Sequence, residues 1–163
     1  DAAEVLAVKR RLLAGYRPSC PVERVAVDVR DPAGLAAALA DRVDDGDRVV
    51  VVSEGLLPYL DAAAVRALAG TLADAAAAVW LTDVVSASSA AQMAQLARSA
   101  GLRVELYGLD SLDVFERSGW TVTDYRILPV PRRGPWPAPA VRHGTGGAYS
   151  RQVVDGVLVL ARG

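Results

Sequence analysis

The segment at residues 48–53 constrains the fold more than any other part of the chain. It reads R-V-V-V-V-S, with four consecutive valines. β-branched side chains favour extended backbone, and the run is too short and too uniformly apolar for a surface helix. A strand of this kind, apolar at every position, is typical of a parallel sheet that is covered on both faces. The segment therefore predicts a buried strand in the middle of an α/β protein.

The flanking sequence alternates between strand-like and helix-like periodicity. Further strands are predicted at residues 24–28, 78–81, 120–127 and 153–161. Helices are predicted at residues 4–13, 32–42, 61–74, 86–101 and 111–117. Asp61 is the expected N-cap of one helix, and Ser86 or Ser88 that of the next. The last two strands have no helix between them, so we expect an antiparallel edge pair after a helix-covered parallel sheet.

Composition narrows the functional classes. The chain has 163 residues, about one domain's worth, and we expect residues 1–163 to form a single domain. Its 18 basic and 19 acidic side chains give a net charge of −1, which argues against a nucleic-acid partner or an acidic membrane surface. The apolar runs are too short to cross a bilayer. Cys20 is the one cysteine, so no cysteine-based metal site is expected, and the expected compartment is the cytoplasm.

Three acidic residues end apolar strands: Asp28, Glu54 and Asp83. Ligands of open α/β sheets bind at the carboxyl ends of strands, so each is a candidate site residue. The alternative is a structural role, with Asp28 and Asp31 capping the helix at residue 32 and Asp83 holding the loop before Ser86. Glu54 precedes Gly55, and a glycine there lets a flat ligand approach the backbone.

His143 is the only histidine, and it lies in a loop rich in proline and glycine. It is either an ordinary loop histidine or a general base supplied to the site by that loop. The neighbouring glycine-rich segment, residues 144–147 (G-T-G-G), precedes no predicted helix, so it does not form a phosphate-binding loop. No metal site is expected.

Four segments, taken in order, resemble the leucine carboxyl methyltransferase family. Residues 1–13 resemble its acidic D-x-P-x-V-hydrophobic-x-x-K segment, with Ala3 where the family has proline. Residues 27–31 (V-D-V-R-D) resemble its D-L-R-D segment, and residues 53–60 (S-E-G-L-L-P-Y-L) resemble its A-E-G-L-L-x-Y-L signature. Residues 112–120 resemble a late element that ends in G-W.

The resemblance implies a Rossmann-like class I methyltransferase that uses S-adenosylmethionine. The family's first acidic residue, here Asp1, would bind the ribose hydroxyls of that cofactor. Asp28 and Val29 would flank its adenine. Glu54, with Gly55 beside it, would lie against the methionine part. A carboxylate suits the ribose and amine contacts because it accepts several hydrogen bonds and pairs with positive charge.

The expected reaction is O-methylation of a carboxyl or hydroxyl group on a small molecule. A carboxylate acceptor is already ionised and needs no base, whereas a hydroxyl acceptor needs one, and His143 is the candidate. A nicotinamide-dependent oxidoreductase on a similar sheet and a remnant that has lost its site are the alternatives.

The resemblance also implies a strand order. The family's order is 3-2-1-4-5-7-6, and its first two strands, with a glycine-rich loop and N-terminal helices, would precede Asp1. We therefore expect a truncated chain, a fragment that binds the cofactor weakly by itself. The strand at residues 24–28 is expected to pair directly with that at residues 48–53, giving 3-4-5-7-6. The alternative is a detached strand and the order 4-5-7-6.

Overall fold

The computed structural model describes residues 1–44, 46–127 and 153–162. The chain divides into two compact units, Asp1–Asp47 and Arg48–Gly163, and each is described by itself. That residues 1–163 form a single domain stays a prediction.

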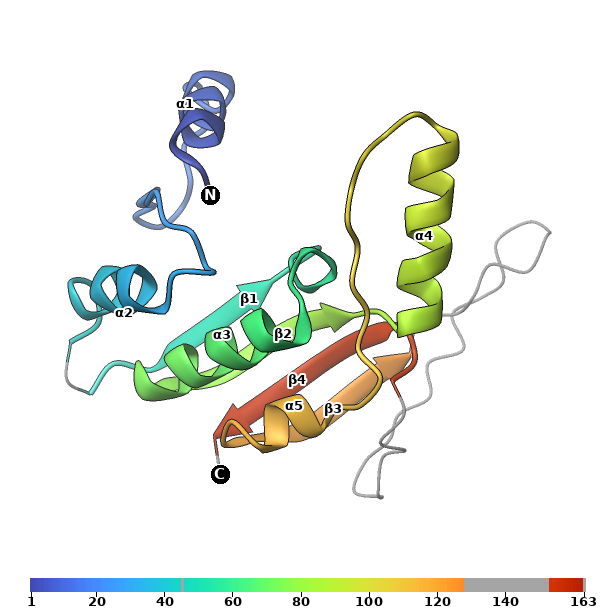
Figure 1. Ribbon diagram of the computed structural model, residues 1–163. Coiled ribbons are helices and arrows are strands. Elements are labelled where there is room, and N and C mark those ends of the chain that lie inside the picture. Colours follow the sequence, from blue (N-terminus) through green and yellow to red (C-terminus); the bar gives the residue numbers. More distant parts are fainter. Residues whose placement is uncertain (45, 128–152, 163) are drawn as a thin grey trace. The chain divides into compact units, whose positions relative to one another are not determined.

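The second unit contains a four-stranded sheet in the order β1-β2-β4-β3 (Figure 1). Its strands are β1 (Val49–Ser53), β2 (Ala77–Val84), β3 (Trp120–Ile127) and β4 (Gly156–Arg162). β1 and β2 are parallel, and β4 is antiparallel to both β2 and β3. The predicted α/β sheet with an antiparallel C-terminal strand pair is confirmed.

The predicted pairing of residues 24–28 with β1 is wrong, because no strand forms at residues 24–28. The sheet has the alternative order, 4-5-7-6 in the family's numbering. The carbonyl groups of this segment accept other hydrogen bonds: Arg10 donates to Arg24 O at 3.3 Å, and the Asp1 nitrogen donates to Val27 O at 3.4 Å. The segment has only two β-branched residues before Asp28, so its own propensity for a strand is small.

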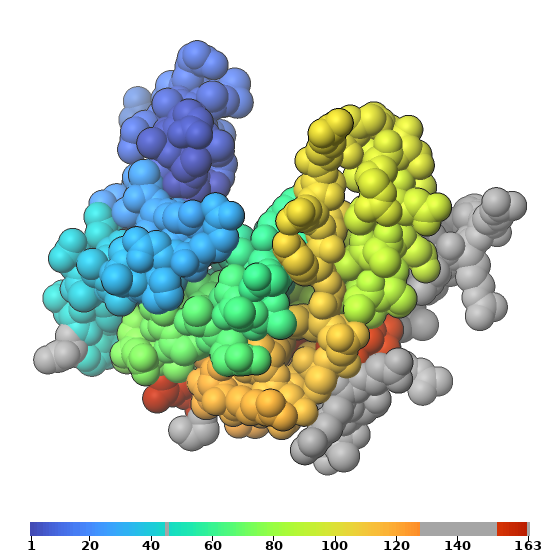
Figure 2. Space-filling model, viewed as in Figure 1, coloured from blue at the N-terminus to red at the C-terminus, as the bar shows by residue number. Residues whose placement is uncertain are grey.

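One face of the sheet is covered by α3 (Ala62–Asp74) and α5 (Asp113–Glu116), which lie in front of the strands in Figure 1. Their atoms contribute to the green and orange surface in Figure 2. Asp61 caps α3 by accepting a hydrogen bond from Ala64 N at 2.8 Å, as predicted. α4 (Ala87–Ser99) begins at the carboxyl end of β2, where Ser86 is its cap. The short 3-10 helix η1 (Leu57–Tyr59) follows β1.

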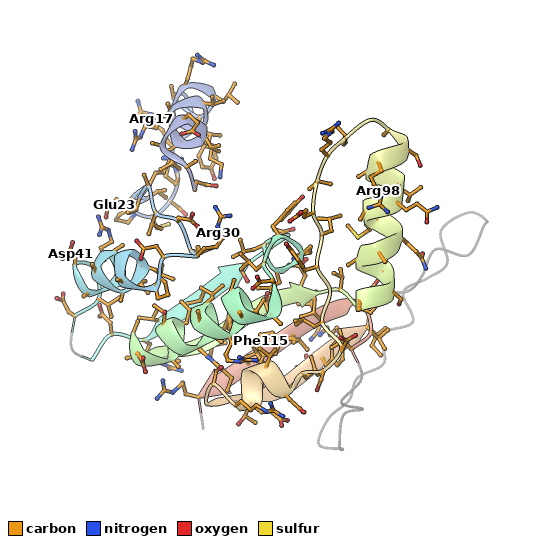
Figure 3. The ribbon with its side chains drawn as sticks, viewed as in Figure 1. Arg17, Glu23, Arg30, Asp41, Arg98 and Phe115 are labelled. Atoms are coloured by element: carbon orange, nitrogen blue, oxygen red, sulfur yellow. The ribbon has the colours of Figure 1, made fainter. Side chains whose placement is uncertain are left out.

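The core between this face and its helices contains three aromatic side chains. Trp80 on β2 meets Phe115 of α5, labelled in Figure 3, edge-on with ring centroids 5.5 Å apart. It meets Trp120 on β3 at 5.7 Å. Trp120 Nε1 donates to Ala69 O in α3 at 2.9 Å, so its polar atom is satisfied although the ring is buried. Trp80, Trp120 and Phe115 are all buried, so they form an aromatic centre of this core.

The prediction that β1 is buried on both faces is wrong. Val51 pairs with Trp80 in the parallel register and so shares the core face. Val50 and Val52 point to the other face and are 58% and 69% exposed. β1 is also an edge strand of this sheet, with β2 as its neighbour. A run of identical apolar residues carries no alternation, so it cannot tell which face a sheet leaves open.

The first unit contains α1 (Ala3–Leu12) and α2 (Pro32–Ala40). Asp31 caps α2 by accepting from Gly34 N at 3.1 Å, and proline occupies the first helical position, as its fixed φ allows. Downstream of α2, the Arg42 guanidinium binds both carboxylate oxygens of Glu23, at 2.7 and 3.0 Å. This ion pair holds the pKa of Glu23 below its usual value.

None of the helices in the described part of the chain has both the length and the apolar character that a bilayer-spanning helix needs.

Candidate functional site

Glu54 and Gly55 form a turn at the carboxyl end of β1. Gly55 has φ of +61°, a conformation that costs a side chain about 1 kcal/mol or more and that glycine adopts freely. Its backbone N–H donates to Asp83 Oδ1 on β2 at 2.8 Å. Glu54 is exposed, and within the described residues its carboxylate makes no hydrogen bond or ion pair. The sheet therefore presents one unengaged carboxylate beside a turn that a second carboxylate holds.

The residue on the other side of Glu54 is also hydrogen-bonded to β2. Ser53 Oγ donates to Thr82 Oγ1 at 2.7 Å and accepts from Trp80 Nε1 at 3.0 Å. Thr82 is buried, and its hydroxyl donates onward to Asp83 O at 3.2 Å. These bonds fix the carboxyl end of β1 to the carboxyl end of β2.

The sequence reasoning missed the roles of Ser53 and Thr82 and misplaced that of Asp83. One of the two roles considered for Asp83 was to hold the loop before Ser86, but Asp155 does so, accepting from Ser86 N at 2.8 Å. The available signal was a hydroxyl or acid at the end of each strand. Which of these groups meet depends on the register between β1 and β2, which the sequence does not show.

The space above the turn is open. A Cβ built on Gly55 would meet no atom within 4 Å. Within η1, Pro58 O accepts from Tyr107 N at 2.8 Å, which holds the segment after α4 against η1. The Tyr107 hydroxyl donates to Glu105 at 2.8 Å, and this bond raises the pKa of Tyr107. Glu54 and Gly55 thus fit the expected cofactor, with a free carboxylate for a positive group and room for a ligand at the backbone.

Three other predicted site residues, Asp1, Asp28 and Val29, lie in the first unit, and the structure brings them together there. The Asp1 nitrogen lies 3.4 Å from Val27 O, next to Asp28 in the chain. The Asp1 carboxylate pairs with Lys9 Nζ at 2.5 Å, across two turns of α1. The amino end of the chain therefore lies beside the segment that contains Asp28 and Val29.

Asp31 caps α2, and Asp28 does not. Asp28 Oδ1 accepts from Arg30 N at 2.9 Å and from Arg30 Nε at 3.0 Å, and its Oδ2 accepts from Arg30 Nη2 at 2.8 Å. The Arg30 hydrogen bonds hold the pKa of Asp28 below its usual value. An ionised carboxylate has about four lone-pair positions, so Asp28 can accept a further hydrogen bond from a ligand amine.

His143 lies outside the described residues, as does the glycine-rich segment at residues 144–147. Cys20 is exposed. Among the residues that the structure describes, no group of three or more His, Cys, Asp or Glu side chains is arranged to hold a metal ion.

Comparison with known families confirms the resemblance over part of the chain. Residues 1–73 match the leucine carboxyl methyltransferase family, a segment that contains Asp1, Asp28, Val29, Glu54 and Gly55. The rest of the chain, including β2, β3 and β4, lies beyond this match.

Among solved structures, the chain is similar to magnesium protoporphyrin IX methyltransferase from Synechocystis PCC 6803, which was crystallised with bound SAH. The TM-score is 0.51 at 11% sequence identity, a likeness that supports the fold alone. The match covers 99% of this chain and 59% of that one, so the chain spans less than two-thirds of the length of this methyltransferase. No curated protein sequence matches the chain.

Proposed function

We propose that this protein is an S-adenosylmethionine-dependent methyltransferase that methylates a carboxyl or hydroxyl oxygen of a small molecule. The observation that carries the proposal is the position of the E-G-L-L-P-Y-L segment. It begins at the carboxyl end of β1, beside the carboxyl end of the parallel strand β2. Open α/β sheets bind their ligands at this edge. The family match over residues 1–73 supports the same conclusion.

Each proposed cofactor contact follows from the chemistry of its side chain. The exposed Glu54 carboxylate would pair with the ammonium or sulfonium charge, since ion pairs with a carboxylate are among the stronger polar contacts. Asp28 would accept from the adenine amino group, and Val29 would pack against the ring. Asp1 would accept from the ribose hydroxyls. Gly55 would let the cofactor approach the turn closely.

The cofactor, when bound, supplies an electrophilic methyl group, and the protein must hold the acceptor oxygen in line with the bond that breaks. Positioning of this kind provides much of the rate in a displacement between two bound molecules. A carboxylate acceptor attacks without losing a proton. A hydroxyl acceptor loses one, and His143 is the candidate base for that case.

Isothermal titration calorimetry with S-adenosylhomocysteine on the full-length protein, meaning the complete product of its gene, tests the proposal. We expect micromolar-range binding that Glu54→Ala weakens by about 1–3 kcal/mol, the usual loss for a charged hydrogen-bond partner. Glu116→Ala, which removes an exposed glutamate from α5, is the matched control and should bind like the wild type.

Two results would count against it. A folded wild-type protein that binds no S-adenosylhomocysteine favours the remnant that has lost its site. Normal binding by the Glu54→Ala variant keeps the function but removes Glu54 from the site.

A further inference from the structure

We propose that Asp83 is a positioning residue, which holds the Glu54 carboxylate in the orientation that binds the cofactor. The inference rests on the proposed function and adds a residue to it. Asp83 lies ten positions beyond the segment that matches the methyltransferase family. Its role follows from its contact with the turn.

The first step is the contact itself. Asp83 Oδ1 accepts from Gly55 N at 2.8 Å, across 28 residues of sequence. Gly55 follows the end of β1, where the ladder with β2 stops at the pair Ser53 and Thr82. The Asp83 side chain therefore continues the connection between the two strands by one further hydrogen bond. A bond to an ionised oxygen is stronger than a bond between neutral groups.

The second step is what this bond controls. Glu54 lies between two fixed points, Ser53 with its bond to Thr82 and Gly55 with its bond to Asp83. Glycine adopts many backbone conformations at similar cost, so without the second bond the turn would sample alternatives. Glu54 itself makes no contact within the described residues that would hold its carboxylate. The orientation of Glu54 thus depends on the backbone on either side of it.

A rival role for Asp83 is direct attraction, in which its own negative charge binds the positive end of the cofactor. The two roles differ in what they need. Positioning needs an acceptor oxygen, whereas attraction needs a charge. An asparagine keeps the oxygen and removes the charge, so Asp83→Asn separates them.

The experiment uses the full-length protein with Asp83→Asn, Asp83→Ala and the control Asp74→Ala. Asp74 is the last residue of α3. It lies near the amino end of β2, whereas Asp83 lies near the carboxyl end of that strand. Two quantities are measured: the hydrogen-exchange rate of the Gly55 amide by NMR, and the affinity for S-adenosylhomocysteine by calorimetry. Each affinity is measured again in a Glu54→Gln background.

Asp83→Ala should speed Gly55 exchange by about tenfold or more, because the amide loses its acceptor. It should weaken S-adenosylhomocysteine binding by about tenfold, a typical loss for a contact that depends on one charged hydrogen bond. Asp83→Asn should stay within about threefold of the wild type in both, since its amide oxygen still accepts. In the Glu54→Gln background, Asp83→Ala should change affinity by less than about twofold, because coupled residues are not additive.

Three outcomes overturn the proposal while leaving the proposed function intact: unchanged Gly55 exchange in Asp83→Ala, equal loss of affinity in Asp83→Asn and Asp83→Ala, or a full effect of Asp83→Ala in the Glu54→Gln background. A folded wild-type protein without affinity for S-adenosylhomocysteine contradicts the proposed function itself. If Asp83→Ala does not fold, Asp83→Asn still decides between acceptor and charge.

Discussion

At the scale of single residues, the Tyr125 side chain on β3 binds both backbone groups of Val154, a residue just before β4. Its hydroxyl accepts from Val154 N at 2.8 Å and donates to Val154 O, just before β4 begins. The residue is 6% exposed, and burial raises the pKa of Tyr125 above its usual value. Both backbone groups of Val154 are therefore satisfied by the same tyrosine.

We predict that Tyr125→Phe lowers the free energy of unfolding by about 1–3 kcal/mol at pH 7, because Val154 loses both of its bonds. The unfolded tyrosine ionises near pH 10, and the folded one at higher pH. The contribution of Tyr125 to stability is thus complete below pH 10 and is lost as the pH rises through the folded pKa. Urea unfolding at pH 7 and at pH 10.5 should show a narrower gap between wild type and variant at the higher pH. A gap that widens there contradicts this account.

The ion pair between Asp28 and Arg30 gives a second prediction at this scale. Because the guanidinium lowers the pKa of Asp28, the contribution of the pair is present above the unfolded pKa and is lost as the pH falls through the folded one. The side-chain carbon of Asp28, followed by NMR against pH, should titrate below the usual range near pH 4. In Arg30→Ala its midpoint should rise. Glu23, which pairs with Arg42 instead, is the internal reference and should not change.

At the scale of elements, the approach of residues 108–109 to the start of α4 depends on one glycine. Leu109 N donates to Val85 O at 2.9 Å, and Leu109 forms a parallel bridge with Ser86. A Cβ on Gly108 would clash with the backbone of Ser86, and neither backbone can move without losing these bonds. Side-chain size is therefore limited at residue 108.

Gly108→Ala should lower the free energy of unfolding by about 1–3 kcal/mol, the usual cost of overpacking. Gly70→Ala is the matched control, since a Cβ on Gly70, inside α3, meets no atom within 4 Å. Alanine is the better helix former, so this control should raise the free energy of unfolding by about 0.5–1 kcal/mol. Urea unfolding measures both. Equal effects of the two substitutions would show that the close approach carries no cost.

Most elements could be predicted from periodicity and capping residues, because those signals are local. The strand β3 has the predicted bounds, and the caps Asp61 and Ser86 are confirmed. β4 begins three residues later than predicted, at Gly156. The backbone of Val154 is bonded to Tyr125, and Asp155 accepts from Ser86 N, so long-range contacts displace the start of the strand.

The candidate site also has one part that could be predicted from the sequence and another part that could not. The motif at residues 53–60 could be placed at the end of a strand from the sequence alone, because strand, turn and glycine are all local features. The contact between Gly55 and Asp83 could not, since it joins residues 28 positions apart and depends on the register of two strands. The bond of Asp28 to Arg30 is local, yet capping of α2 was an equally good use for that carboxylate.

At the scale of the whole molecule, the proposed cofactor residues are distributed over two compact units, with Asp1, Asp28 and Val29 in the first and Glu54 and Gly55 in the second. Within the first unit, Arg30 binds the Asp28 carboxylate, and within the second, Asp83 binds the turn that carries Glu54. The central claim is that the turn at Glu54 and Gly55 binds S-adenosylmethionine or its product.

Hydrogen–deuterium exchange of the full-length protein, with and without S-adenosylhomocysteine, tests this claim most directly, because it needs no knowledge of the methyl acceptor. The account predicts slower exchange at residues 54–57 that grows with ligand concentration, while β3 is unchanged. Glu54→Gln should shift this dependence to higher concentration. Ligand binding that leaves residues 54–57 unprotected, or protection that Glu54→Gln does not shift, would contradict it.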